Sequence, residues 1–240
     1  MLKKDNIKDQ EINLKVIARV RNDFPTKFGL PRQSGLASSI MSKIVFEDAY
    51  RISEALRGID GYSHLWLIWG FSEAFEEKWS PTVRPPRLGG NTRVGVFATR
   101  APYRPNPIGL SSVRLEAVEK TSEGTVLVVS GADIMDKSPI YDIKPYLPYV
   151  DIHSDATDGF TAVTKDYRLE VDFPEELLCQ IPKDLQGALI EALAGDPRPS
   201  YHTDPARIYG LAYAKYDVKF TVKDGTLHVC RINEREIGNI

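Results

Sequence analysis

Arginine, proline and glycine are concentrated in one segment of this 240-residue chain, from Pro81 to Leu110. The segment contains five arginines and six prolines, and the stretch from Lys78 to Leu115 has seven basic residues and no acidic one. Proline fixes φ and lowers the entropy that a loop loses on ordering, so it can hold long side chains in place. A guanidinium binds two oxygens of a phosphate or carboxylate at once. We therefore expect an anion-binding surface here, against the alternative of a solvated basic loop.

Aromatic residues lie in and around this basic segment. An exposed ring can replace the stacking partner of an unpaired nucleic-acid base, which contributes about 1–3 kcal/mol per base. Tyr103, between Pro102 and Arg104, is the best placed for such a contact, whereas Trp66 and Trp69 are expected in the core.

Strand-like stretches dominate the chain up to about residue 150. They cover residues 14–20, 44–46, 62–71, 92–99, 113–119, 125–131 and 140–143. Short strands separated by Gly, Pro and Ser are typical of a closed or nearly closed antiparallel barrel. Residues 48–57 have helical spacing and predict a short helix. Because no strand is followed by GxGxxG and a helix, a dinucleotide-type fold is not indicated.

A polar stretch after Asp151 separates two predicted domains, a β-barrel over residues 12–155 and a small α+β domain over residues 160–240. In the second we expect a strand at 167–171, a helix at 184–193 and a hairpin of 218–222 with 226–229 around Asp224-Gly225. The fold class is therefore mainly β. Residues 1–150 have 21 basic and 17 acidic residues, and residues 151–240 have 10 and 16. The balance changes from +4 to −6, which argues against broad phosphate contact by the second domain and leaves its role open.

The remaining composition indicates a cytoplasmic protein. No apolar run approaches the roughly 20 residues of a membrane span, and the first ten residues lack the apolar centre of a signal peptide. Cys179 and Cys230 have neither CxxC nor Cys/His spacing, so we expect core residues and no metal or disulfide site.

Six blocks of sequence, in one order, point to a known family. They are PRQ at 31–33, GYSHLW at 61–66, RPPRLGG at 84–90, GVFATR at 95–100, RPNPIGL at 104–110 and DIKPYLP at 142–148. In these blocks the chain resembles the TsaA/TrmO family from about residue 16 to 150. Residues 196–201 and 209–210 also resemble the C-terminal module of its longer bacterial members.

The resemblance implies a homodimeric β-barrel methyltransferase outside the Rossmann-like class. Such an enzyme transfers a methyl group from S-adenosylmethionine to the N6 nitrogen of threonylcarbamoyladenosine beside the tRNA anticodon. Carried over residue by residue, cofactor contacts fall on Pro31, Arg32, Gln33, His64, Leu65, Arg100, Leu110, Asp136, Lys137, Ser138 and Pro139. The last four read Asp-Lys-Ser-Pro where Asp-Gly-Thr-Pro is expected. With tRNA as the polyanion, the RNA contacts expected in the basic segment are Arg84, Arg87, Tyr103 and Arg104.

The ligand's chemistry suits these positions. S-adenosylmethionine presents an adenine, ribose hydroxyls and a carboxylate, which Gln33, Asp136, and Arg32 or Arg100 could contact. A urea-like N6 nitrogen is a poor nucleophile, so some group must accept or orient its proton. Asp136 and Tyr146 are candidates for this role, and no catalytic base is assigned.

Other interpretations remain open at this point. The barrel could bind S-adenosylmethionine or RNA as a regulator without turnover, or it could methylate a small metabolite or a protein. His64 is either a structural histidine or, as the resemblance favours, part of the cofactor wall. Which arginine contacts the cofactor and which contacts RNA phosphate is also open.

Overall fold

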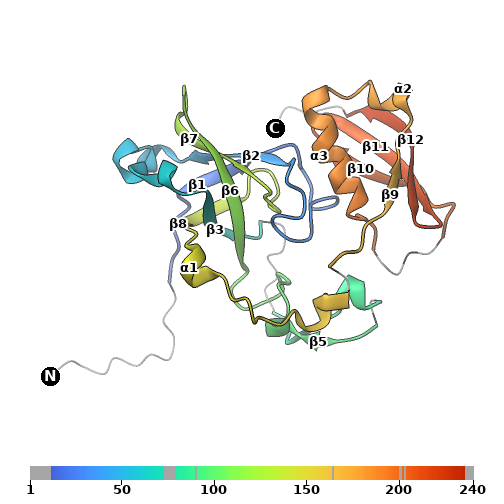
Figure 1. Cartoon of the computed structure of the whole chain (residues 1–240), viewed down its shortest axis with the longest axis horizontal. Helices are drawn as coiled ribbons and strands as arrows, with labels where there is room; N and C mark the ends of the chain where they lie inside the picture. The colour runs from blue at the N-terminus through green and yellow to red at the C-terminus, as the bar shows by residue number, and fades with distance from the viewer. Residues whose placement is uncertain are drawn as a thin grey trace.

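The computed structural model describes residues 12–72, 79–89, 91–163, 165–199, 202 and 204–235. Within these residues, six strands close into an antiparallel barrel in the order β1-β2-β7-β6-β3-β8 (Figure 1). They are β1 (Ala18–Arg21), β2 (Met41–Phe46), β3 (His64–Gly70), β6 (Ile108–Thr121), β7 (Gly124–Ser130) and β8 (Pro139–Pro145). Pairing of β1 with β8, in which Ala18 lies opposite Ile140, completes the ring.

Alternation along β3 shows why these sequences form the barrel. Leu65, Leu67 and Trp69 are buried in its core, while the intervening side chains are less buried. This follows from the period of two in a strand, which sends successive side chains to opposite faces. Trp69 lies across from Gly109, where any Cβ would collide with the indole ring.

The prediction of one helix at 48–57 is only partly correct. The chain there forms two 3₁₀ turns, η1 (Asp48–Tyr50) and η2 (Ser53–Leu56), followed by a third, η3 (Ile59–Gly61). Residues of η1 and η2 are all exposed or half-buried. An amphipathic helix takes most of its stability from packing its apolar face, and this segment has too little burial to provide it.

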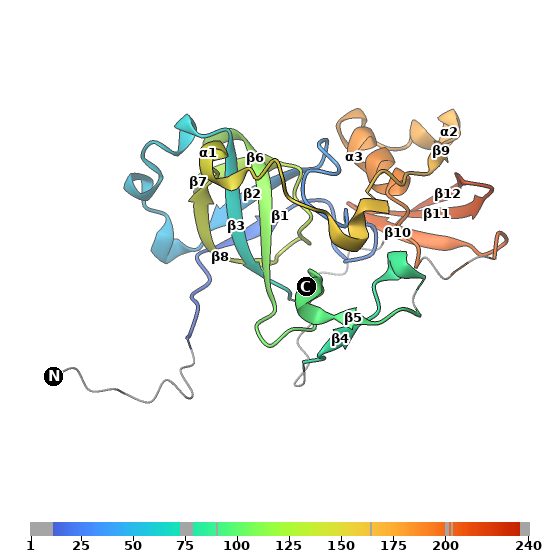
Figure 2. The same cartoon turned by 60° about the horizontal axis from the view of Figure 1, so that its bottom comes forward.

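The predicted strand at 92–99 is also largely wrong. Only β5 (Val94–Gly95) pairs, with β4 (Thr82–Val83), and η5 (Val96–Ala98) follows directly. Pro81 and Pro85 flank β4 and have no N–H to extend the ladder. The short hairpin lies apart from both larger sheets (Figure 2), on the excursion between β3 and β6 that also contains η4 (Pro86–Leu88).

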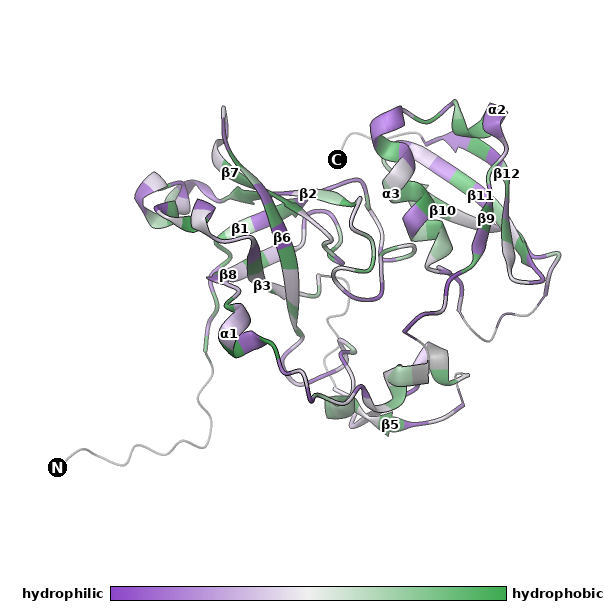
Figure 3. Cartoon of the chain, viewed as in Figure 1, coloured by the Kyte–Doolittle hydropathy of each residue, from purple (hydrophilic) through white to green (hydrophobic). Residues whose placement is uncertain are grey.

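The C-terminal part is a four-stranded sheet in the order β10-β11-β12-β9. Its elements are β9 (Glu170–Asp172), α2 (Glu175–Leu178), α3 (Lys183–Ala194), β10 (Tyr209–Tyr213), β11 (Tyr216–Lys223) and β12 (Thr226–Glu234), and α1 (Pro148–Asp151) and η6 (Gly159–Val163) precede them. Buried and less buried residues alternate along β11, which appears as bands of hydropathy in Figure 3. The predicted α3 and the β11–β12 hairpin are confirmed, and so is the mainly β class.

Both cysteines are exposed, which corrects the expectation that they lie in the core. Cys230 follows the buried Val229 on β12, so alternation turns its side chain outward. Cys179 is the C-cap of the short helix α2. Among the described residues, no helix has the length and apolar character needed to cross a membrane.

The loop between β1 and β2 joins the two sheets. Its residues Phe24, Ala37 and Ile40 belong to the apolar core of the C-terminal sheet rather than to that of the barrel. Phe24 packs edge-on against Tyr213 at 5.1 Å between ring centroids. Ser39 adds hydrogen bonds of 3.0 Å from its N and its Oγ to the Glu191 carboxylate of α3. The loop that contains the predicted cofactor residues 31–33 is therefore held by the C-terminal domain.

Candidate functional site

One end of the barrel gathers three loops. Because neighbouring strands are antiparallel, the C-terminal ends of β1, β3 and β7 and the N-terminal ends of β2, β6 and β8 all lie at this end of the barrel. The loops are residues 22–40, 71–107 and 131–138. Gly35 N donates to Gly131 O at 2.8 Å, and Asp136 N donates to Phe24 O at 2.9 Å, so the first and third loops run side by side. Most predicted site residues therefore meet at this end, which we call the loop end.

Arg100 and Gln33 are brought into direct contact at the loop end. Arg100 Nη1 donates to Gln33 Oε1 at 2.5 Å, although 67 residues separate them in sequence. The Arg100 side chain remains exposed. An exposed guanidinium that a neighbouring amide already orients can bind an anionic ligand with little further loss of side-chain entropy.

Asp133 is a third residue of this site, and its carboxyl group lies near Arg100. Ser111 Oγ donates to Asp133 Oδ1 at 2.5 Å, and Trp69 Nε1 donates to Ser111 Oγ at 2.9 Å. Burial raises the pKa of Asp133, and the Ser111 hydrogen bond and the charge of Arg100 only partly oppose this. The half-buried side chain of Asp133 therefore lies close enough to the exposed guanidinium of Arg100 for the two charges to interact.

Asp133→Asn should change how stability depends on pH. A carboxyl whose folded pKa is raised above its ordinary value of 3.8 stabilises the fold below that value and loses this contribution as pH rises through the folded pKa. The unfolding free energy of the wild type should therefore fall relative to that of Asp133→Asn as pH rises from about 4, by about 1.4 kcal/mol per unit of pKa difference. Urea titrations of both proteins across a pH series measure this difference. A constant gap between them across the series would contradict the prediction.

The turn at residues 136–139 is attached to β1. Asn22 N donates to Asp136 Oδ1 at 3.1 Å, and Lys137 N donates to Val20 O at 2.9 Å. Lys137 has a φ of 66°, the left-handed region that glycine adopts most readily. The departure from Asp-Gly-Thr-Pro thus alters the side chain while keeping the turn. Ser138 is buried, and Pro139 is the first residue of β8.

His64, Leu65 and Tyr146 lie at the opposite end of the barrel. Tyr146 N donates to His64 O at 3.0 Å, and the two rings are 6.1 Å apart. The His64 Nδ1 is 2.9 Å from Ser63 Oγ, while the Leu65 side chain is fully buried in the barrel core. The seven residues of β8 separate this end from Asp136 by about 20 Å at roughly 3.3 Å per residue. Within one chain, the two catalytic candidates Asp136 and Tyr146 are therefore far apart.

The arginines of the basic segment differ in what they contact. Arg104 is half-buried and donates to Ala101 O at 3.1 Å, Val96 O at 3.1 Å and Thr99 O at 2.6 Å. Its guanidinium therefore holds the loop that precedes it. Arg84, in contrast, is exposed. Arg87 lies in η4, but its side chain is outside the described part of the structure.

Two aromatic side chains from the acid-free stretch form an exposed pair. Phe97 is 73% exposed and Trp79 is 48% exposed, and their rings stack at 6.1 Å with an interplanar angle of 27°. Ser80 N donates to Tyr103 O at 3.1 Å, which brings the half-exposed Tyr103 to the same part of the chain. We call Trp79, Phe97 and Tyr103 the aromatic cluster.

Two family models match the chain. The tRNA-methyltransferase O N-terminal domain covers residues 19–152, and the TrmO C-terminal domain covers residues 166–235. The chain belongs to the TrmO family. A relative in Escherichia coli K12, named tRNA (adenine(37)-N6)-methyltransferase, is 36% identical over 227 residues, which cover 91% of this chain and 97% of the relative.

Other TrmO relatives agree in sequence and structure. One in Pseudomonas aeruginosa is 41% identical, covering 84% of this chain and 89% of its own, and its name assigns it provisionally to the S-adenosylmethionine-dependent methyltransferases. A crystal structure of TrmO from Pseudomonas aeruginosa superposes with a TM-score of 0.75 at 31% identity, covering 93% of this chain and 100% of the crystallised one. The loop end and the C-terminal sheet therefore belong to a TrmO architecture.

Asp133 and Phe97 are residues of this TrmO chain that sequence reasoning did not select for the site. The sequence marks Asp133 as the first acidic residue after the strand-forming run 125–131. Phe97 could also have been selected from the sequence, because it is an aromatic residue within the acid-free stretch. The sequence does not reveal which residues they contact. Asp133 lies near Arg100, and Phe97 stacks on Trp79. Among the described residues, no group of three His, Cys, Asp or Glu side chains could hold a metal ion.

Proposed function

We propose that this chain methylates the N6 nitrogen of adenine 37 in tRNA, with S-adenosylmethionine as the methyl donor and threonylcarbamoyladenosine as the form of the base. The names of the relatives support the reaction. The observation that carries the proposal is the exposed Arg100, which is hydrogen-bonded to Gln33 and lies in an acid-free stretch of sequence that also contains exposed aromatic rings.

The residues at the loop end fit the cofactor. The Arg100 guanidinium suits the carboxylate of S-adenosylmethionine, and the Gln33 amide suits a polar edge of the ligand. Arg32 is the poorer choice for the carboxylate, because its Nη2 already donates to two backbone carbonyls, at 3.0 and 3.2 Å. Pro31, Leu110 and residues 136–139 would complete the wall. Bound there, S-adenosylmethionine supplies a methyl group activated by its sulfonium.

The basic segment is the proposed RNA surface. Arg84 would contact phosphate, and the aromatic cluster would stack on unpaired bases of the anticodon loop. Arg104 contributes by holding residues 96–101 in place. Arg87 completes the proposed set on sequence grounds alone.

Replacing Arg84 by alanine should flatten the salt dependence of tRNA affinity. Each lost phosphate contact lowers the slope of log affinity against log salt by roughly 0.7–0.9. Filter binding across a salt series measures the slope. Lys223→Ala removes one exposed positive charge from the end of β11 and should leave it unchanged. Parallel lines for wild type and Arg84→Ala would remove Arg84 from the RNA surface.

We also propose a homodimer in the cytoplasm. His64 and Leu65 lie at the opposite end of the barrel from Arg100, so one chain does not bring all the expected cofactor residues together. A second chain could place its His64 end against the loop end of the first. Sedimentation of the protein with and without S-adenosylmethionine tests this arrangement.

Transfer of a labelled methyl group tests the proposed reaction. The purified protein is incubated with S-adenosylmethionine and with either unmodified or threonylcarbamoylated tRNA, and the nucleosides are analysed by mass spectrometry. Methylation of the threonylcarbamoylated RNA alone is expected. Thermal stabilisation by S-adenosylmethionine without transfer to either RNA would favour a regulator, and transfer only to a small molecule or a protein would overturn the RNA substrate.

A further inference from the structure

We propose that Asp196 and Arg198 of the C-terminal domain are positioning residues for the cofactor loop. They act through Arg32, which lies next to Gln33 in sequence. This inference rests on the proposed function, because it assumes that Gln33 and Arg100 contact S-adenosylmethionine.

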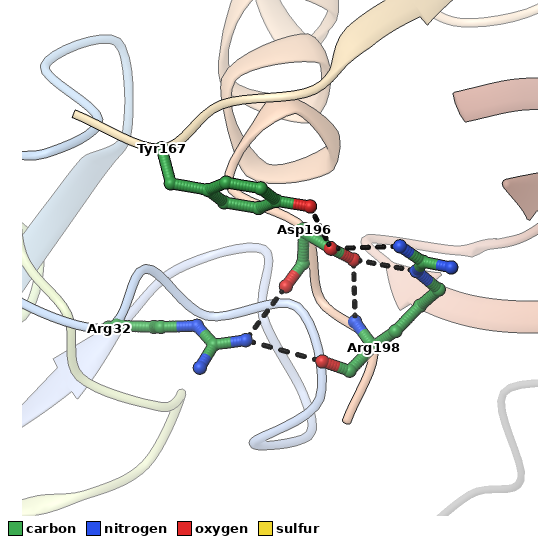
Figure 4. Close-up of polar contacts among 4 residues, drawn as sticks. All are labelled: Arg32, Tyr167, Asp196 and Arg198. Atoms are coloured by element: carbon green, nitrogen blue, oxygen red, sulfur yellow. Dashed lines mark hydrogen bonds and ion pairs between the residues drawn. The ribbon is translucent and has the colours of Figure 1, made fainter. Parts of the chain in front are cut away.

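Asp196 and Arg198 form a buried ion pair (Figure 4). Their side chains are only 8% and 13% exposed. Arg198 Nε donates to Asp196 Oδ1 at 2.8 Å, and Arg198 Nη2 donates to Asp196 Oδ2 at 3.0 Å, so the guanidinium binds both carboxylate oxygens. Tyr167 Oη also donates to Oδ2 at 3.0 Å. Burial alone would raise the pKa of Asp196, but the hydrogen bond and charge of Arg198 lower it below its usual value, so the pair is charged at neutral pH.

The ion pair fixes a short backbone segment in an uncommon conformation. Asp196 has a φ of 54°, in the left-handed region that costs most residues about 1–2 kcal/mol. Arg198 N donates to Asp196 Oδ1 at 3.3 Å and closes a local turn. The carbonyl oxygens of residues 196 and 198 both face the guanidinium of Arg32.

Arg32 binds these two carbonyls with one nitrogen. Its Nη2 donates to Asp196 O at 3.0 Å and to Arg198 O at 3.2 Å, across 164 and 166 residues of sequence. In Figure 4 the guanidinium of Arg32 reaches from the loop between β1 and β2 to this turn. Since consecutive Cα atoms are only about 3.8 Å apart, a shift of Arg32 must move Gln33 and its contact with Arg100.

A contact that only stabilises the fold is the alternative. Buried ion pairs are weak evidence for stability, because desolvation opposes the attraction. The structure offers a matched comparison in Ser39, which contacts Glu191 across the same domain boundary without involving Arg32. Loss of a stabilising contact should lower the melting temperature in either case, whereas only loss of the positioning contact should weaken cofactor binding.

Isothermal titration of the full-length protein with S-adenosylmethionine tests the inference. Arg198→Ala should weaken binding by about tenfold, which is the effect expected when one hydrogen bond between protein and ligand is lost. Arg198→Lys, which retains one charged donor, should recover part of the affinity. Ser39→Ala should leave the affinity unchanged even if it lowers the melting temperature. Affinity of each variant for tRNA without cofactor should stay at the wild-type level.

The outcomes separate the inference from the proposed function. If the wild type does not bind S-adenosylmethionine, the proposed function fails and this inference fails with it. If the wild type binds and the folded Arg198→Ala variant binds equally well, only the inference is overturned. Equal weakening by Ser39→Ala would also overturn it, because domain docking in general would then be responsible. Asp196→Asn, which tolerates a positive φ, serves as the second variant if Arg198→Ala does not fold.

Discussion

Arg100→Ala should weaken S-adenosylmethionine binding roughly 10- to 150-fold, the equivalent of about 1.5–3 kcal/mol for a hydrogen bond to a charged group. The guanidinium is exposed, so the barrel should not depend on it for folding. Its loss also leaves the Gln33 Oε1 without the donor at 2.5 Å and Asp133 without a nearby positive charge. Isothermal titration gives the affinity, and thermal melting followed by circular dichroism shows whether the variant is folded.

Arg93→Ala is the matched control for Arg100. Arg93 is an exposed arginine of the same basic segment, and its Nη1 donates to Thr82 Oγ1 at 2.6 Å within the β4–β5 hairpin. This variant should bind the cofactor as the wild type does. Unchanged affinity in a folded Arg100→Ala protein would exclude Arg100 from the cofactor site and return the carboxylate role to Arg32.

Phe97→Ala should weaken tRNA binding by about 1–3 kcal/mol, or roughly 5- to 150-fold, because it removes a stacking surface for an unpaired base. Phe97 is 73% exposed, so the substitution exposes little of the core. Its ring stacks on Trp79, whose fluorescence should be quenched when RNA binds to the wild type. Affinity for S-adenosylmethionine should change little, since the predicted role of Phe97 concerns the RNA.

Tyr149→Ala controls for the loss of an exposed aromatic residue. Tyr149 is 83% exposed on α1, outside the basic segment, and its removal should leave tRNA affinity unchanged. Phe97→Leu keeps the apolar surface without the ring and should behave like the alanine variant. If Phe97→Ala instead dissociates a dimer while RNA affinity is retained, the pair is part of a contact between subunits, and the stacking proposal is wrong.

The barrel strands were predictable because each is a short apolar or alternating run between Gly, Pro and Ser, which is a local property of the sequence. Each of the six barrel strands overlaps a predicted one. The failures at 48–57 and 92–99 have a different origin. There the local pattern was present, but a packed face in the first case and a long partner strand in the second were missing.

The site was predictable only as separate blocks. Pro31–Gln33 and Arg100 were selected from motifs, but their contact depends on how two loops lie at the barrel end. The C-terminal domain had two signals, its charge of −6 and the motif at residues 196–201, but neither revealed its contact with Arg32, which spans more than 160 residues. Contacts between residues so far apart in sequence are determined by tertiary packing, and no local sequence pattern indicates them.

The shared core of the β1–β2 loop also constrains folding during synthesis. The strands of the barrel are complete once residue 145 has been made, yet Phe24 and Ile40 are packed by residues as late as Val229. At about 5–20 residues per second, the ribosome needs roughly 4–17 s to supply the rest. During that interval the nascent barrel displays an apolar loop on its surface, where chaperones bind and where neighbouring chains can associate incorrectly. The loop end therefore reaches its final form only after the C-terminal sheet has been made, and a pause in the codons of that sheet would prolong this exposure.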